Sequence, residues 1–308
     1  MDTVETFGNR KKDHIKISLD SESQAVTDQF SQIHLQHNPL PEINFSVIQI
    51  RSKVFGHSLN SPHFVSSMTL CHSGAGDLNQ RMASACAQVG WMMGVGSQRR
   101  QLFDPGAAKE CEQLRKSFPE LILFGNIGLS QVIVEAPEKI QSLVDSLGAQ
   151  FLVVHLNPLQ EAIQREGTPQ FAGGRKALEV LCDQLSVQVV LKETGCGFSK
   201  TSLESIKNMK LGAVDVSGLG GTHWGRIEGL REDSESSAYR TAKTFGFWGQ
   251  STVESRLAAR ETQLKFETWA SGGIRSGLDS AKALALGAGK VGFAKPVSYT
   301  HLTLPTKA

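Results

Sequence analysis

The 308-residue sequence lacks the features that mark several large classes of protein. Its five cysteines are odd in number and include no Cys-x-x-Cys pair, which argues against a disulfide framework or a zinc site and favours a reducing compartment. It has no run of about 18 apolar residues that could span a membrane, and its first residues are polar, unlike a signal peptide. A net charge of +2 gives no overall field that would attract nucleic acid. We therefore expect a cytoplasmic protein whose ligands are small molecules, with no nucleic-acid or membrane partner.

The sequence does contain a repeated pattern of short apolar runs, each of which ends on small or polar residues. The runs are continuous rather than alternating, as expected for parallel strands that are buried on both faces. Helix-start spacing occurs between several of them, at Thr201-Ser-Leu-Glu204, Ser251-Thr-Val-Glu254 and Ser276-Gly-Leu-Asp279. Eight strands with intervening helices predict a (β/α)8 barrel, with its active site where the strands end. A doubly wound open sheet is the alternative, although no Gly-x-Gly-x-x-Gly follows the first run. The expected strands are 64–69, 91–97, 122–128, 151–157, 188–194, 213–220, 266–274 and 289–296.

The pattern divides the chain into three parts. Residues 1–60 are irregular and predict an N-terminal extension that packs on the barrel, which we expect to span 61–296. Within the barrel, residues 221–265 are too long for one connection and predict a surface loop followed by a helix from about Ser251. Residues 297–308 are Thr-rich where an eighth helix should follow, and they match one reading frame of a sequencing adapter. We expect a non-native tail there and a missing eighth helix.

Glycine-containing turns end the last two expected strands, at Gly272-Gly273 with Arg275 and at Lys295. In a barrel these two loops usually bind phosphate, because glycine allows backbone N–H groups to approach and a cation adds charge. A plain tight turn is the alternative. The glycines of 216–222 indicate another close approach of backbone to ligand. Lys192 interrupts an apolar strand, so it must reach water or meet a negative partner, and an anionic flavin ring edge would suit it.

Polar side chains follow one another at the end of the fourth expected strand, where His155, Asn157, Gln160 and Glu161 lie close in sequence. A single strand histidine is more often a core residue, but such a group at the catalytic end of a barrel favours function. Glu161 could bind Mg²⁺, which takes few protein carboxylates and completes its shell with substrate phosphate oxygens.

Taken together, these motifs resemble the type II, FMN-dependent isopentenyl-diphosphate isomerases along most of the chain, from Arg10 to about Pro296. Their joint order and their placement at strand ends are what make the resemblance specific. The motifs are Arg10-Lys11 with His14, Ser66-Ser-Met-Thr69, Gly94-Val-Gly-Ser-Gln-Arg99, Gly125-Asn-Ile-Gly128, His155-Leu-Asn-Pro-Leu-Gln-Glu161, Lys192-Glu-Thr-Gly-Cys-Gly197, Gly218-Leu-Gly-Gly-Thr-His-Trp224 and Ser271-Gly-Gly-Ile-Arg275.

The resemblance implies an isomerase of isoprenoid biosynthesis that interconverts isopentenyl and dimethylallyl diphosphate by a flavin-assisted allylic proton shift. It implies FMN in the reduced form, NADPH as the reductant, Mg²⁺, and a homo-oligomer, typically a tetramer or larger. The implied catalytic residues are Gln160 and His155, and the implied metal ligand is Glu161. The implied substrate-binding residues are Arg10, Lys11, Ser97, Arg99, His155, Asn157 and Gln160. The implied cofactor-binding residues are Met68, Thr69, Ser97, Asn126, Lys192, Ser217, Thr222, Gly272, Gly273, Ile274, Arg275, Ala294 and Lys295.

The chain departs from the family pattern in two loops. Leu70-Cys71 stands where two glycines are common, and Arg165 and Thr168 stand where Pro and Asp are usual. An FMN-dependent 2-hydroxy-acid oxidase uses the same barrel and is the alternative function. It would require a His-Gly-x-Arg-like motif near the seventh strand, where this chain has Trp269-Ala-Ser-Gly-Gly273. A barrel that binds flavin or diphosphate without catalysis is the third reading.

Overall fold

The computed structural model describes residues 4–68 and 76–297. Eight parallel strands form one sheet in the order β10-β3-β4-β5-β6-β7-β8-β9. The sheet closes on itself through Ala270, which follows β9: its N–H donates to Lys290 O (2.9 Å) and its carbonyl accepts from Gly292 N–H (2.8 Å). The predicted (β/α)8 barrel is thus confirmed. The strands are β3 (His63–Val65), β4 (Met92–Gly94), β5 (Leu123–Gly128), β6 (Phe151–Leu156), β7 (Gln188–Glu193), β8 (Ala213–Asp215), β9 (Glu267–Trp269) and β10 (Val291–Phe293).

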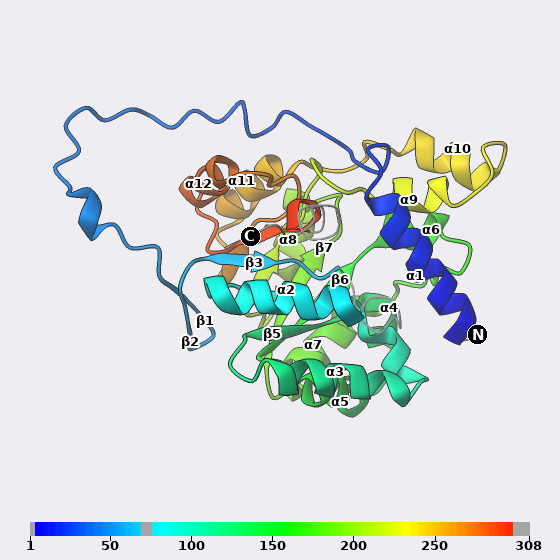
Figure 1. The fold of residues 1–308 in the computed structure, drawn as a ribbon. Coiled ribbons are helices and arrows are strands. Elements are labelled where there is room, and N and C mark those ends of the chain that lie inside the picture. The colour runs from blue at the N-terminus through cyan, green and yellow to red at the C-terminus, as the bar shows by residue number, and fades with distance from the viewer. Residues whose placement is uncertain (1–3, 69–75, 298–308) are drawn as a thin grey trace.

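Helices surround the strands (Figure 1). Each expected strand run overlaps an observed strand, and most of the residues that follow a strand within its run belong to loops at the carboxyl end of the barrel. The helices of the barrel are α2 (Gly76–Val89), η2 (Gln98–Leu102), α3 (Gly106–Ser117), α4 (Leu129–Val134), α5 (Pro137–Leu147), α6 (Pro158–Ile163), α7 (Gly174–Gln184), α8 (Lys200–Ile206), α9 (Trp224–Leu230), α10 (Ser237–Thr244), α11 (Thr252–Thr262) and α12 (Gly277–Ala285).

The strands divide the core into two layers, because successive side chains of a strand point to opposite faces. Outward-facing side chains such as Leu152 and Val154 pack against the helices. Inward-facing aromatic rings fill the barrel, with Phe124 stacked on Phe151 at a centroid distance of 4.6 Å and Trp269 at 5.5 Å from Phe151. This packing leaves the carboxyl ends of the strands as the place where a ligand can enter.

Two local expectations need correction. Residues 221–251 were expected to be a surface loop, but they contain α9 and α10, which begin at the N-caps His223 and Ser236. The expected helix start at Ser251 is confirmed, with a complete capping box to Glu254. The start expected at Thr201 lies too late, because Ser199 is the residue that caps α8.

Residues before the barrel form three pieces. Helix α1 (Val4–Ser18) lies beside α9, and β1 (Ser52–Val54) pairs with β2 (His57–Leu59) in a hairpin. Between them an extended segment with the short helix η1 (Phe45–Val47) projects from the body (Figure 1). The tail predicted at 297–308 lies outside the described part except for Val297, so the missing eighth helix stays a prediction. Among the described residues, no helix is both long and apolar enough to cross a membrane.

Candidate functional site

A cavity of about 480 Å³ opens at the carboxyl ends of the strands. It is bounded by the strand-end loops on one side and by α1 on the other, through Lys11, His14 and Ile15. Of the predicted cofactor residues, those that line it are Met68, Lys192, Ser217, Thr222, Gly272, Gly273, Ile274, Arg275, Ala294 and Lys295. Thr69, Leu70 and Cys71 lie outside the described residues.

Two glycine turns pack directly against each other in the wall of this cavity. Gly272 (φ +93°) and Gly273 (φ +76°) adopt left-handed backbone conformations that favour glycine. A Cβ at Gly272 would collide with Gly218 O, and one at Gly273 would meet the carbonyl of Gly220 at 2.8 Å. The turn therefore requires glycine at both positions, and its backbone is held open to the cavity.

Two cations lie beside this turn. Arg275 Nη2 donates to Gly220 O (2.7 Å) and Lys295 Nζ donates to Asp20 O (3.0 Å). Burial lowers the pKa of Lys295, opposed by Asp20, and the nearby charge of Arg275 lowers it further. Repulsion between two cations at a glycine turn is relieved by an anion, so this end of the cavity suits a phosphate group.

Two serines at the end of β3 supply further polar groups to the same cavity. The hydroxyls of Ser66 and Ser67 are buried and have no hydrogen-bond partner among the described residues. A buried hydroxyl without a partner is costly, and a polar ligand in the cavity would satisfy both.

Lys192 lines the cavity and lies near the negatively charged groups that its burial requires. Its Nζ donates to Glu193 O (2.7 Å) and lies 3.4 Å from Ser217 Oγ. Burial lowers the pKa of Lys192, while the carboxylates of Asp215 and Glu193 raise it. Ser217, with φ +37°, is one of the few non-glycine residues in a left-handed conformation, and such strain is common at ligand sites.

A smaller cavity of about 90 Å³ adjoins the first. The two share Lys11, His14, Ser67, Met68, Lys192, Thr194 and Trp224. It contains every predicted substrate-binding residue together with the predicted metal ligand: Arg10, Lys11, Ser97, Arg99, His155, Asn157, Gln160 and Glu161. It also contains Asn126, which the sequence assigned to the cofactor. The cavity gathers three cationic side chains from α1 and from the loop after β4, which favours a ligand with several negative charges.

His155 is neutral in this arrangement. Its Nδ1 lies 2.9 Å from Asn126 Oδ1. Burial lowers the pKa of His155 to about 3, and the charges of Lys192, Lys11 and Arg99 act in the same direction. In the ligand-free site, His155 can accept or donate a hydrogen bond but does not carry a positive charge.

The short helix α6 holds the amide and carboxylate groups of the smaller cavity in one hydrogen-bonded chain. Asn157 Nδ2 donates to Gln160 Oε1 (3.0 Å) and to Glu161 Oε1 (2.9 Å). The second oxygen of Glu161 accepts from Thr168 N–H at 2.6 Å. The α6–α7 loop, in which Thr168 departs from the family pattern, therefore positions the predicted metal ligand.

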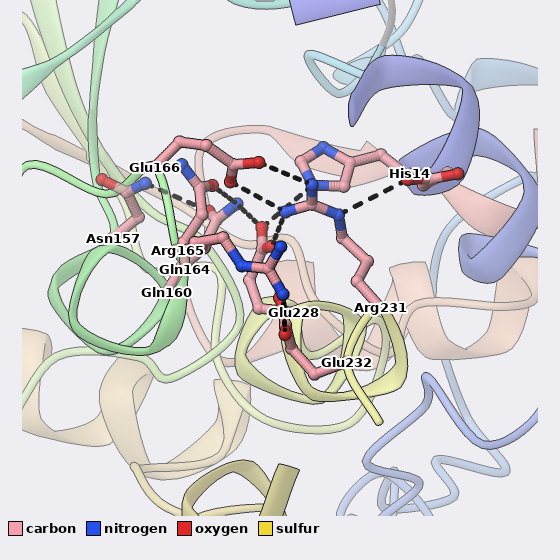
Figure 2. Close-up of polar contacts among 10 residues, drawn as sticks. His14, Asn157, Gln160, Gln164, Arg165, Glu166, Glu228, Arg231 and Glu232 are labelled. Carbon is pink, nitrogen blue, oxygen red and sulfur yellow. Dashed lines mark hydrogen bonds and ion pairs between the residues drawn. The ribbon is translucent and has the colours of Figure 1, made fainter. Parts of the chain in front are cut away.

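The sequence did not identify a buried ion-pair cluster behind Gln160 (Figure 2). Glu228, on α9, accepts from Gln160 Nε2 at 2.8 Å and lies 2.9 Å from His14 Nε2. Its other oxygen lies 2.7 Å from Arg231 Nη1, and Arg231 also contacts Glu166 at 3.0 Å. The cluster joins α1, α9 and the α6–α7 loop around the cavity, and it fixes the amide of Gln160.

Charges within the cluster are set by burial and by hydrogen bonds. Burial acts to raise the pKa of Glu228, but hydrogen bonds from His14, Gln160 and Arg231 hold it at about 2. Burial lowers the pKa of His14 against the opposing pull of Glu228. Glu228 is therefore an ionised hydrogen-bond acceptor. In the sequence, its position was indicated only by its spacing of four residues from Trp224, which places both side chains on one face of a helix.

No protein-family model matches the chain. Among curated proteins, an isopentenyl-diphosphate delta-isomerase of Legionella pneumophila (strain Lens) is 48% identical over 292 residues, which cover 94% of this chain and 85% of the relative. A protein of the same name from Bdellovibrio bacteriovorus is 46% identical over 295 residues, with coverage of 94% and 85%. One from Synechococcus is 39% identical over 290 residues, with coverage of 93% and 83%.

Solved structures share the fold at low sequence identity. A flavocytochrome b2 variant superposes with a TM-score of 0.65 and 18% identity, over 94% of this chain and 72% of that one. A mandelate oxidase with a monooxide FMN adduct gives a TM-score of 0.56 and 15% identity, with coverage of 97% and 83%. At these identities the likeness supports the barrel fold alone.

Proposed function

The chain belongs to the isopentenyl-diphosphate delta-isomerase family, and from that premise we propose that it converts isopentenyl diphosphate into dimethylallyl diphosphate for isoprenoid synthesis. The observation that carries the proposal is the pair of adjoining cavities. One has a glycine turn with two cations for a cofactor phosphate, and the other has three cations and an amide chain for a diphosphate.

We propose reduced FMN, with NADPH as the reductant, as the occupant of the larger cavity. The residues fit this group: Gly272 to Arg275 and Lys295 would hold the single phosphate, while Lys192, Ser66 and Ser67 would meet polar atoms of the ring system. When bound, the reduced flavin would supply electron density and a proton-transferring ring beside the alkene. A dinucleotide fingerprint is absent from the sequence, which favours FMN over FAD.

The protein residues bind and orient the substrate. Arg10, Lys11 and Arg99 would bind the diphosphate, and neutral His155 would add a hydrogen bond. The reaction needs a proton added at the terminal methylene carbon and another removed from C2, the allylic carbon between the double bond and the carbon that bears the diphosphate. Gln160, fixed by Asn157 and Glu228, would hold the reacting carbons in place at the boundary of the two cavities.

We propose Glu161 as the only protein carboxylate that binds Mg²⁺. In the described residues, no group of three or more His, Cys, Asp or Glu side chains could hold a metal alone. This matches a Mg²⁺ ion that takes one carboxylate and completes its shell with diphosphate oxygens and water.

We also propose a homo-oligomer, typically a tetramer or larger, in the cytoplasm, where the free thiols of Cys86, Cys111, Cys182 and Cys196 would remain reduced. The oxidase alternative has only the fold in its favour, because the relatives at 39–48% identity are all named as isomerases.

The test of the cofactor is the spectrum of the purified protein, followed by chromatography of the released chromophore. We expect flavin absorbance and an FMN product. A chromophore that runs as FAD, or a protein that binds no flavin when FMN is added, would remove this part of the proposal.

A further inference from the structure

The extended segment 34–51, which we call the arm, leaves the barrel after Ile33 and returns at β1. In the described part of the chain, its hydrogen bonds are only local, such as Leu40 N–H to Asn38 Oδ1 (3.1 Å) and Val47 N–H to Asn44 O (3.1 Å). Figure 1 shows the arm as a loop that stands away from the barrel with η1 near its far end. A long exposed segment whose hydrogen bonds are only local is expected to have a binding role.

The arm is apolar where a solvent-exposed loop should be polar. Seven of the fifteen exposed large hydrophobic side chains of the described residues lie in it, with Phe45 90% exposed and Leu40 74% exposed. Together they present on the order of 800 Å², which is what a standard protein interface takes from each partner. The seven side chains are Leu35, Leu40, Ile43, Phe45, Val47, Ile48 and Ile50.

The composition of the arm favours a protein partner. Glu42 is its only acidic residue and Arg51 its only Lys or Arg, so it has no basic cluster for nucleic acid or anionic lipid. Depletion of charge around aromatic and aliphatic side chains is typical of the centre of a protein interface. Pro39 and Pro41 stiffen the segment, which lowers the entropy cost of ordering it on a partner.

The same chain carries a matching surface on the other side of the barrel. Phe247 and Trp248 are adjacent, 64% and 61% exposed, and follow α10. Phe247 borders a hollow of about 430 Å³ between α9 and α10, which Leu230, Tyr239 and Ala242 also line, and Trp248 is its neighbour in the sequence. Arg226 and Lys243 line the hollow together with one acidic residue, Glu22, so a net positive charge faces the single acidic residue of the arm.

The arm projects away from the hollow of its own chain. The arm and α10 lie on opposite sides of the barrel in Figure 1. An out-and-back loop of this length reaches at most about 30 Å from its base. A contact between the arm of one copy and the hollow of the next copy would bury the exposed apolar side chains of both. Such a contact is heterologous and builds a ring when its rotation closes.

We propose that the arm docks into the α9–α10 hollow of a second copy of this chain, with Phe45 against Phe247 and Trp248. This inference names the contact of the homo-oligomer proposed above and does not depend on the isomerase chemistry. It also gives α9, which carries Glu228, a neighbour from another subunit.

The experiment measures the mass of the full chain by light scattering and mass photometry for the wild type, Phe45→Asp, Trp248→Asp and the control Val134→Asp. Val134 is 72% exposed but stands alone on α4. We expect the wild type and the control to be oligomers, and each of the other two variants to weaken association roughly thirtyfold or more. Unchanged circular dichroism would show that the variants fold.

The decisive measurement is made on a mixture of the two association-defective variants, Phe45→Asp and Trp248→Asp. An intact arm on Trp248→Asp still meets an intact hollow on Phe45→Asp, so the mixture should form heterodimers that neither variant forms alone. Oligomers that survive Phe45→Asp, or a mixture that stays monomeric, would overturn the docking contact and leave the oligomer itself standing. A monomeric wild type, including one that floats with phosphatidylcholine vesicles, would overturn the contact and the oligomer together.

Discussion

Replacing Arg231 with glutamine tests the ion-pair cluster beside the smaller cavity. The side chain of Arg231 is 10% exposed and that of its partner Glu228 is 1% exposed. Without the guanidinium, the Glu228 carboxylate stays buried with only His14 and Gln160 as partners. Removing one member of a buried pair typically costs about 3–5 kcal/mol. We expect a fall in melting temperature on the order of 10 °C at neutral pH.

The pH dependence of this loss has a defined sign. The folded-state pKa of Glu228, at about 2, lies below its ordinary value of 4.5. Its contribution to stability is therefore present above pH 4.5 and disappears as the pH falls toward 2. Because Arg231 helps to depress this pKa, the stability difference between wild type and Arg231→Gln should be largest at neutral pH and should shrink through this window.

Arg165 provides a matched control. Its Nη2 lies 2.5 Å from Glu232 Oε2 and joins the same loop to the same end of α9, but its side chain is 74% exposed. Arg165→Gln should therefore cost about 0–1 kcal/mol. Thermal unfolding followed by circular dichroism at several pH values compares the two. Equal losses in the two variants, or an Arg231→Gln loss that does not change with pH, would refute the reasoning.

Three further predictions concern the cavities. Glu161→Gln should abolish the dependence of turnover on Mg²⁺ and leave the flavin spectrum unchanged, because Glu161 lies in the smaller cavity; wild-type Mg²⁺ dependence would contradict the assignment. Gly272→Ala should weaken FMN binding roughly tenfold or more in a fluorescence titration, because a Cβ there collides with Gly218 O and φ is +93°. Gly277→Ala is its control, because a Cβ at Gly277 would meet nothing within 4 Å. Equal FMN dissociation constants for the two variants would refute a role of the Gly272 turn in binding FMN. Burial holds the pKa of His155 at about 3, so its ring signals in nuclear magnetic resonance should not titrate near 6.5 in the ligand-free protein, and a midpoint there would show that it is not neutral.

The sequence was informative where local pattern and tertiary structure agree. Strands β5, β6 and β7 are buried almost throughout, so their apolar runs stand out clearly. The group from His155 to Glu161 was visible because one strand and one short helix supply all of it. The closure of the barrel, in which β10 pairs with β3, followed from the count of eight expected strands.

Residues that depend on contacts between distant segments could not be predicted. Glu228 and Arg231 on α9 have the composition of a solvated helix end, and only their contacts with His14 and Glu166 show that they are buried. Helix α9 is also short and contains two glycines, which conceals its helical pattern. Apolar and polar residues of the arm alternate at 43–47, as in a strand, so its projection from the barrel could be found only in three dimensions.

The most direct test of the proposed function is product analysis in deuterated water. The purified protein, loaded with FMN and reduced by NADPH, is incubated with isopentenyl diphosphate and Mg²⁺. We predict dimethylallyl diphosphate that carries solvent deuterium in a methyl group, with no net consumption of NADPH per turnover. Absence of this product from a flavin-loaded protein that instead oxidises a 2-hydroxy acid would contradict the account.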